Sequence, residues 1–100
     1  MPELCLNLLC PASLEEKLLD LLLMHPGLDV FTSTRTAAHG LAFGALSANE
    51  QVLGRAHATH VQVLLPERQR DALLDAVRRE FGGTGLRYWI GPVTDAGDIA

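Results

Sequence analysis

The sequence contains few aromatic residues and few basic residues, and both shortages limit the partners it can have. Of its 100 residues, 8 are Lys or Arg and 12 are Asp or Glu, which gives a formal net charge of −4. A nucleic-acid-binding domain normally carries a basic stripe or patch. Aromatic residues make up 5% of the chain and form no RNA-binding signature. We therefore expect no nucleic acid partner.

The chain also lacks a disulfide pattern and a long hydrophobic run. Cys5 and Cys10 lie five residues apart on one predicted strand. At roughly 3.3 Å per residue they are about 16 Å apart and point to opposite faces, so they cannot form a disulfide with each other.

The apolar stretch Leu18–Met24 is interrupted by Asp20 and is too short to cross a bilayer. The start, Met1-Pro2-Glu3, has no basic region or cleavage site. These features predict a cytoplasmic protein without membrane insertion.

A pattern of apolar run, proline, amphipathic stretch and glycine occurs twice, 55 residues apart. Leu6–Pro11 aligns with Val61–Pro66, and Gly27 aligns with Gly82. Each copy predicts a strand, a helix and a second strand. Two such units in a short chain predict an α+β, ferredoxin-like βαββαβ fold, with a four-stranded antiparallel sheet and two helices on one face. Residues 1–100 would form a single domain.

The boundaries of these elements follow from apolar periodicity and from turn residues. We expect strands at 4–10, 28–36, 55–65 and 86–93, with the first and third in the centre, and a flexible tail at 94–100. Ser13 and Glu16 form a capping box for the first helix, and Pro66 opens the second. The residues that follow the helical period should face the sheet; they are Leu14, Leu18, Leu21 and Leu22 in the first helix and Leu73, Leu74, Val77 and Phe81 in the second.

One face of this sheet would have no helix over it. The alternation of side chains places a half-apolar set on that face: Cys5, Asn7, Leu9, His60, Gln62, Leu64 and Trp89. Such a face is typical of a surface that is buried in an oligomer. The alternative is a half-exposed sheet face, which antiparallel sheets tolerate.

The connection Ala37–Gly54 is the strongest functional candidate, because a connection of about 18 residues is uncommon in a small domain. If it is a hairpin arm that turns near Ala48-Asn49, His39 faces His57. Two adjacent imidazoles can hold a divalent transition metal; the alternative is two exposed histidines on a mobile arm. The apolar residues of the arm would dock to a partner or a neighbouring subunit, or fold back onto their own domain; they are Leu41, Phe43 and Leu46.

The glycine turn Gly82–Gly85 is the second candidate. Its glycines allow positive φ and close backbone approach, and bare N–H groups can hold an anion. Arg87 follows the turn. The commoner explanation is a glycine that ends a helix, and no helix N-terminus follows to help bind phosphate. No nucleophile with a neighbouring base is visible, so we do not expect an enzyme.

At the level of element order, the whole chain resembles the PII-like superfamily of trimeric ferredoxin-like proteins, which includes the PII signalling proteins and the divalent-cation tolerance proteins. Ser47–Arg55 (SANEQVLGR) and Tyr88–Val93 (YWIGPV) look like motifs of a small uncharacterised bacterial family. Members of that family tend to be encoded beside heavy-metal efflux pumps of the resistance-nodulation-division type.

The resemblance implies a homotrimer whose open sheet faces turn to the centre. It also implies that Ala37–Gly54 occupies the place of the T-loop, and that Gly82–Gly85 occupies the place of the loop that meets nucleotide phosphate between subunits. The chain departs from PII in three ways: the glycine turn is shorter, Arg87 is displaced from the family lysine position, and the arm has no tyrosine. Uridylylation is therefore not supported.

These features together predict a regulatory trimer. It would bind an anionic ligand such as an adenine nucleotide, or a divalent transition metal, at clefts between subunits. Its arm would contact a membrane transporter, a metal-efflux pump. The expected ligand contacts are Glu50, Gln51, Arg55, Gly83, Gly85 and Arg87, with His39 and His57 for a metal. The alternatives are a direct metal-binding tolerance protein and a ligand-free trimeric adaptor that presents Leu41, Phe43 and Leu46.

Overall fold

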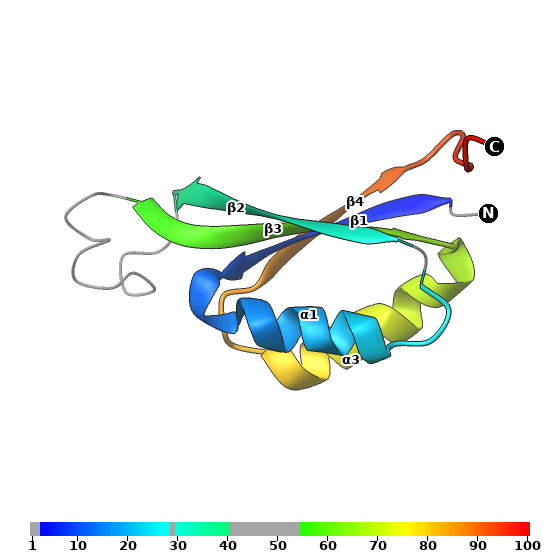
Figure 1. The fold of residues 1–100 in the computed structure, drawn as a ribbon. Helices are drawn as coiled ribbons and strands as arrows, with labels where there is room; N and C mark the ends of the chain where they lie inside the picture. The colour runs from blue at the N-terminus through cyan, green and yellow to red at the C-terminus, as the bar shows by residue number, and fades with distance from the viewer. Residues whose placement is uncertain (1–2, 29, 41–54) are drawn as a thin grey trace.

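The elements follow one another as the internal repeat predicts. The computed structural model describes residues 3–28, 30–40 and 55–100. Along the chain they are β1 (Leu4–Pro11), a 3-10 turn (Ala12–Leu14), α1 (Glu15–Met24), β2 (Phe31–His39), β3 (Arg55–Leu65), a 3-10 turn (Glu67–Gln69), α3 (Arg70–Phe81) and β4 (Arg87–Pro92) (Figure 1). The expected ferredoxin-like βαββαβ order is confirmed.

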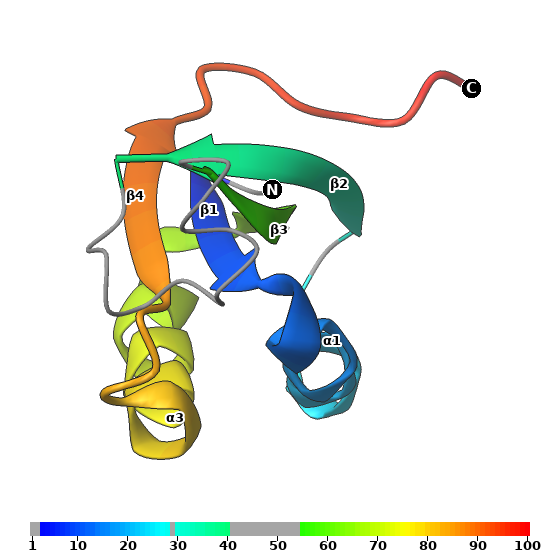
Figure 2. The same ribbon diagram turned by 90° about the vertical axis from the view of Figure 1, so that its left-hand side faces the viewer.

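The four strands form one antiparallel sheet in the order β2-β3-β1-β4. The first and third strands are central, as expected, and β2 and β4 are the outer strands. Both helices lie on the same face of the sheet (Figure 1). Figure 2 shows α1 on the side of β2 and α3 on the side of β4. We call the other face, over which neither α1 nor α3 lies, the open face.

The hydrophobic core lies between the helices and the sheet. Every second residue of β1 and β3 points to the helix side. These side chains are buried from Leu6 to Cys10 on β1 and from Thr59 to Leu65 on β3. All four apolar residues expected on the second helix are buried. On α1, Leu18 and Leu22 are buried and Leu21 is half-buried; Leu14, in the 3-10 turn before α1, is half-buried too. The buried core residues are Leu6, Leu8, Cys10, Leu18, Leu22, Val61, Val63, Leu65, Leu73, Leu74, Val77 and Phe81.

The start of α1 differs from the expected capping box. A 3-10 turn spans Ala12–Leu14, the helix begins at Glu15, and Leu14 occupies the N-cap position without a side-chain cap. Glu15 and Glu16 therefore lie in the first helical turn, where their negative charge interacts favourably with the helix dipole. The prediction that Ser13 caps the helix was wrong, because Pro11 ends the strand and a tighter turn comes first.

The register of β2 against β3 also differs from the expected hairpin. His39 faces Arg55, and His57 faces Ala37. The pairing of β2 with β3 is therefore symmetric about position 47 of the chain rather than about position 48. The prediction that His39 faces His57 was wrong. A shift of one residue would move every side chain to the other face, whereas a shift of two residues keeps each on its own face. The apolar pattern cannot distinguish registers that differ by two.

Several expected contact residues lie outside the described part of the chain; they are Leu41, Phe43, Leu46, Glu50 and Gln51. The tail 94–100 forms neither helix nor strand. Within the described ranges, none of the helices combines the length and the apolar character needed to span a membrane.

Candidate functional site

The open face of the sheet is almost free of charge. The strand registers place 16 described residues on it, and Arg87 is the only one that carries a formal charge at neutral pH. Charged residues make up 20% of the whole chain, so this face is depleted of them. The open-face residues are Thr32, Thr34, Thr36, Ala38, Ala56, Ala58, His60, Gln62, Leu64, Cys5, Asn7, Leu9, Pro11, Arg87, Trp89 and Gly91.

A polar and aromatic cluster lies at the middle of the open face. Asn7 pairs with Gln62 on one side and with Trp89 on the other. Its Oδ1 lies 2.9 Å from His60 Nε2 and accepts a hydrogen bond of 3.4 Å from Gln62 Nε2. The His60 ring stacks on Trp89 at a centroid distance of 5.4 Å. Asn7 is already buried, but 46% of Trp89 remains exposed. An exposed tryptophan held by neighbours is a typical anchor of a protein interface.

Four nitrogen-bearing side chains gather where β2 ends and β3 begins, and we call them the arm-base cluster: Arg35, His39, Arg55 and His57. The alternation along both strands directs all four to the helix side of the sheet, and all four are exposed. Sequence reasoning predicted three of them and missed Arg35. Arg35 could have been predicted, because an even number of positions separates it from His39 along one strand, so both side chains point to the same face.

Within this cluster the two histidines are diagonal neighbours rather than a direct pair. Diagonal positions on two antiparallel strands lie about 7–8 Å apart, still within reach of long side chains. In the described ranges no group of three or more His, Cys, Asp or Glu side chains is arranged to hold a metal ion. The assignment of His39 and His57 to a metal stays a prediction.

Glu15 joins the arm base to helix α1. The Thr59 hydroxyl donates a hydrogen bond of 3.2 Å to Glu15 Oε1, and Arg35 Nη2 lies 3.8 Å from Glu15 Oε2. Thr59 is fully buried, whereas 88% of the Arg35 side chain is exposed. One carboxylate at the start of α1 therefore contacts both strands that border the arm. Because Arg35 is so exposed, its guanidinium remains accessible to an anion.

Cys10 lies beside this junction, paired with Thr59 across β1 and β3. Burial raises the pKa of the Cys10 thiol above its usual value of 9.0, and the negative charge of Glu15 raises it further, while a backbone hydrogen bond with Thr59 lowers it. The thiolate is the reactive form of cysteine. The structure therefore makes Cys10 an unreactive core residue.

We expect alkylation by iodoacetamide at pH 8 to spare the buried Cys10 in the folded protein. Both thiols should react in urea, as mass spectrometry of peptides would show. The pKa of Cys10 is higher in the folded state than in the unfolded state. The neutral thiol therefore stabilises the folded protein at pH values below the pKa of the unfolded thiol, and this stabilisation is lost as the pH rises through the pKa of the folded thiol. Rapid labelling of Cys10 in the native protein would contradict this account.

The glycine turn has a structural reason for its composition. Gly83 and Gly85 have φ angles of 79° and 87°, a region that other residues rarely adopt. No atom lies within 4 Å of the position that a Cβ would take at either glycine, so neither serves a close approach within the chain. The Thr84 hydroxyl donates to the Phe81 carbonyl at 2.6 Å and closes the helix end. Backbone conformation thus accounts for the glycines, and their contact with a ligand stays a prediction.

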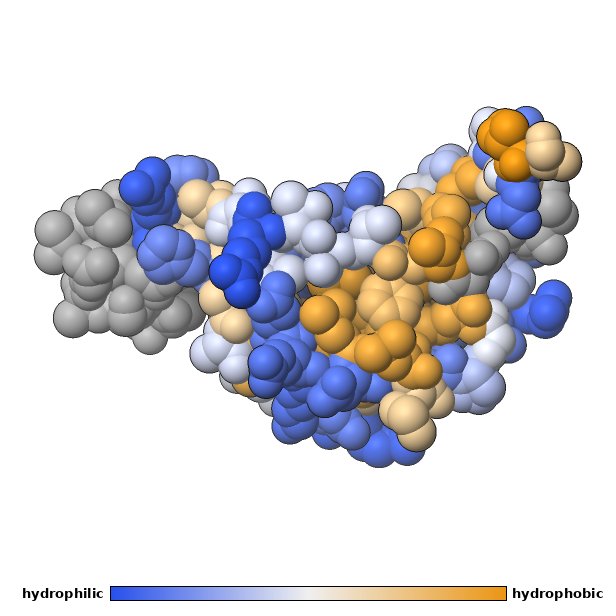
Figure 3. All heavy atoms as spheres, in the orientation of Figure 1, coloured by the Kyte–Doolittle hydropathy of each residue, from blue (hydrophilic) through white to orange (hydrophobic). Residues whose placement is uncertain are grey.

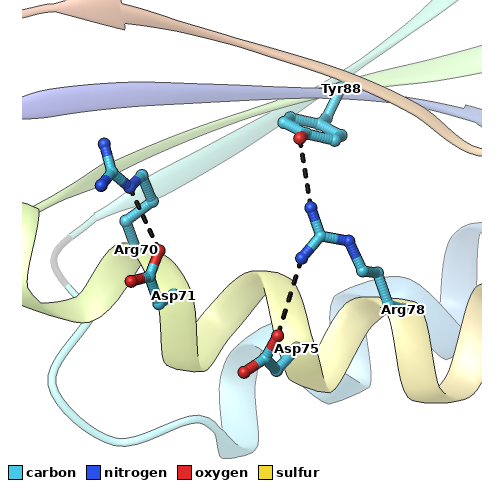
Figure 4. A network of polar contacts seen from close by, with 5 residues as sticks. All are labelled: Arg70, Asp71, Asp75, Arg78 and Tyr88. Carbon is cyan, nitrogen blue, oxygen red and sulfur yellow. Dashed lines mark hydrogen bonds and ion pairs between the residues drawn. The ribbon is translucent and has the colours of Figure 1, made fainter.

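A polar contact joins α3 to β4, the two elements that this turn connects (Figure 4). Arg78 of α3 donates a hydrogen bond of 3.2 Å to the hydroxyl of Tyr88 on β4, and its Nη1 lies 3.6 Å from Asp75 Oδ1. Its guanidinium carbon lies 5.9 Å from the centre of the Tyr88 ring. This contact ties the helix to the outer strand. The sequence alone did not predict this link between Arg78 and Tyr88.

Among the described residues, the predicted ligand contacts form two separate groups. Arg55 lies at the β2 side of the sheet and points to the helix side, whereas Arg87 lies on β4 at the opposite edge and points to the open face. Gly83 and Gly85 belong to the turn that leads into β4.

Comparison with known proteins agrees with this architecture. The family model described as "Protein of unknown function (DUF3240)" matches residues 1–100. A DUF3240 family protein from Shewanella baltica OS155 is similar with a TM-score of 0.82 and 20% identity, over 100% of this chain and 99% of that one. No curated protein matches the chain.

The nitrogen regulatory PII-like protein CPII from Thiomonas intermedia K12 is similar in two solved forms. The form bound to ADP, AMP and bicarbonate has a TM-score of 0.74 and 15% identity, over 99% of this chain and 98% of that one. The apo form has a TM-score of 0.72 and 16% identity, over 93% and 90%. At such identities the likeness concerns the fold, which is the PII-like variant of the ferredoxin-like plan.

Proposed function

Because this chain belongs to the DUF3240 family and has a PII-like fold, we propose that it is a ligand-binding regulatory protein that works as a homotrimer. The open sheet faces turn to the centre of the trimer, and ligand binds in the clefts between copies. Ligand binding changes the arm, and the arm contacts a membrane transporter, a heavy-metal efflux pump. The protein itself catalyses no reaction.

The open face is the observation that carries this proposal. A face with one formal charge among 16 described positions provides no charge complementarity for a strongly charged partner. It can meet copies of itself without like-charge repulsion, and the cores of protein interfaces are depleted of charged residues. Trp89 supplies an exposed apolar anchor, and the hydrogen bonds among Asn7, His60 and Gln62 satisfy the polar groups around it.

The charges at the arm base support an anionic ligand. Arg35 and Arg55 are exposed on the same face, and Glu15 is the acidic group paired with this cluster. Guanidinium groups bind phosphate and carboxylate with paired hydrogen bonds. CPII was solved with ADP, AMP and bicarbonate, and we take an adenine nucleotide as the first ligand to test.

Sedimentation velocity at micromolar chain concentration, followed by a thermal-shift screen, tests the proposal. We expect a trimer, and a higher Tm with ADP, AMP or ATP, because a ligand that binds only the folded state stabilises it. Zinc, copper and nickel belong in the same screen as the metal alternative, with a variant that carries His39→Ala and His57→Ala as the control. A stable single chain would refute the assembly. A trimer whose Tm no nucleotide or metal moves would favour the ligand-free adaptor.

Arg87→Ala is expected to weaken nucleotide binding about ten-fold or more, because a hydrogen bond to a charged group contributes roughly 1.5–3 kcal/mol. Isothermal titration calorimetry with ADP measures this. Arg68→Ala is the matched control, since Arg68 is an exposed arginine of the 3-10 turn before α3, remote from the glycine turn. Equal affinity in the wild type and the Arg87→Ala variant would remove Arg87 from the site.

Regulation of a transporter requires that ligand favour one arm conformation over another, since a ligand with equal affinity for both states shifts no population. The sequence of the arm, with Leu41, Phe43 and Leu46, provides the apolar side chains that would dock. Pull-down of a detergent-solubilised efflux pump with and without nucleotide tests this step. Binding that does not depend on ligand would argue for the adaptor function.

A further inference from the structure

We propose that the helix layer has a docking site for a basic amphipathic helix of a partner protein, in a hollow along α1 that Glu80 of α3 borders. Both helices lie under one face of the sheet (Figure 2). The hollow has a volume of about 370 Å³, and we call it the helix-layer hollow. It shares no residue with the open face or the arm-base cluster, so the inference does not depend on the trimer or on its ligand. The lining residues are Lys17, Asp20, Leu21, Met24, His25, Pro26 and Glu80.

The helix-layer hollow is elongated along α1. Four of its lining residues are spaced as i, i+3, i+4 and i+7 and share one face of the helix: Lys17, Asp20, Leu21 and Met24. At 1.5 Å per residue, this face is about 10 Å long, which is two helical turns. An amphipathic helix that docks in a groove uses apolar side chains with the same spacing. The hollow therefore has the length that two turns of a partner helix need.

Apolar side chains of α1 are left uncovered beside and within the hollow. Met24 is 83% exposed, and Leu23 next to it is 70% exposed. Figure 3 shows apolar surface over the C-terminal half of α1. A site with so exposed a wall is shallow, whereas small-molecule sites usually bury roughly 70–90% of their ligand. A protein segment, which covers the hollow and its rim together, suits it better. Methionine adapts its shape to such partners.

The charges of the helix-layer hollow select a basic partner. Asp20 on α1 and Glu80 on α3 are both exposed, and neither forms an ion pair within the described part of the chain. The Lys17 ammonium lies 5.4 Å from the centre of the Phe81 ring. Two unpaired carboxylates thus outnumber one ammonium among the described lining residues. Lys or Arg side chains that flank the apolar stripe of a partner helix would pair with them.

The same charges disfavour other occupants. Nucleic acids and anionic lipid surfaces have the same sign of charge as the hollow and as the whole chain, whose net charge is −4. A second copy of this chain provides no basic amphipathic helix among its described residues. Its α3 buries its apolar residues in its own core, and the first turn of its α1 is acidic.

A synthetic helical peptide tests the site. The probe has leucines at positions i, i+4 and i+7 and lysines on both sides of this stripe, and the control peptide has glutamate in place of each lysine. We expect isothermal titration calorimetry to give a Kd of about 100 μM or tighter for the lysine peptide, and no binding of the glutamate peptide. In ¹H–¹⁵N spectra, the signals that move should belong to residues 17–26 and to Glu80.

Two variants separate the contributions of charge and of apolar contact. Asp20→Lys combined with Glu80→Lys should weaken binding about ten-fold or more, because like charges then meet across the contact. Asp95→Lys combined with Asp98→Lys is the matched control, since it changes the net charge equally in the exposed tail, and it should leave the Kd unchanged. Met24→Asp should also weaken binding, although it adds a negative charge, because the apolar contact is lost.

Several outcomes would overturn the inference, provided that circular dichroism shows each variant to be folded. Equal affinity for the two peptides, or no binding of either, would do so. An equal loss of affinity in the tail variant and in the hollow variant would show that only the net charge matters. Unchanged or tighter binding by the Met24→Asp variant would exclude an apolar contact. Signals that move on the open face instead of along α1 would exclude the helix-layer hollow as the site.

Discussion

Leu18→Ala is expected to lower the free energy of unfolding by about 2–5 kcal/mol, because it removes buried methyl groups and leaves a cavity. Leu18 has no exposed surface and lies in the middle of α1, in the core between helices and sheet. A small domain has a stability of about 5–15 kcal/mol, so the loss is a large share of the total. Guanidinium unfolding followed by circular dichroism measures it.

Met24→Ala is the matched control for this change. Met24 belongs to the same helix and 83% of it is exposed. Its truncation removes a side chain of similar size from water rather than from the core, so the expected change lies within about 0.5 kcal/mol. If the two variants lost equal stability, α1 would not pack on the sheet as described here.

Trp89→Ala is expected to weaken assembly by about 2 kcal/mol for each contact, roughly 30-fold, because large aromatic anchors at the centre of an interface carry much of its binding energy. Trp89 stands on the open face beside Asn7 and His60. Sedimentation equilibrium over a range of concentrations measures the shift toward single chains. The fold should persist, since only the partly exposed side chain is lost.

The same Met24→Ala variant controls for nonspecific loss of apolar surface. Met24 is more exposed than Trp89 but lines a hollow in the helix layer with Lys17 and Glu80. Its truncation should leave the trimer unchanged. If Met24→Ala dissociated the trimer and Trp89→Ala did not, the helix layer rather than the open face would be the centre of the assembly.

Much of the fold could be predicted because its signals are local. The alternation along Arg55–Leu65 gave the bounds of β3 as observed, and the spacing of Leu73, Leu74, Val77 and Phe81 gave the buried face of α3. Proline and glycine marked where strands and helices end. The duplicated pattern then determined which strands are central, since the ferredoxin-like plan has one arrangement for two such units.

The parts that could not be predicted depend on contacts between elements. The register of β2 against β3 is one case, because registers that differ by two residues bury the same side chains. The hydrogen bond from Thr59 to Glu15 is another, because it joins residues 44 positions apart. The link from Arg78 to Tyr88 is a third. No periodic pattern along the chain announces such pairs.

The strand order has a consequence for how the chain acquires its structure. β1 pairs with β3 and β4, and β2 pairs with β3. Every ladder in the sheet therefore joins the segment before residue 41 to the segment after residue 54, and neither segment contains a ladder of its own. On a ribosome, the first forty residues can form α1 but no sheet until β3 emerges. Such dependence on distant pairing slows folding relative to a helical bundle of the same size.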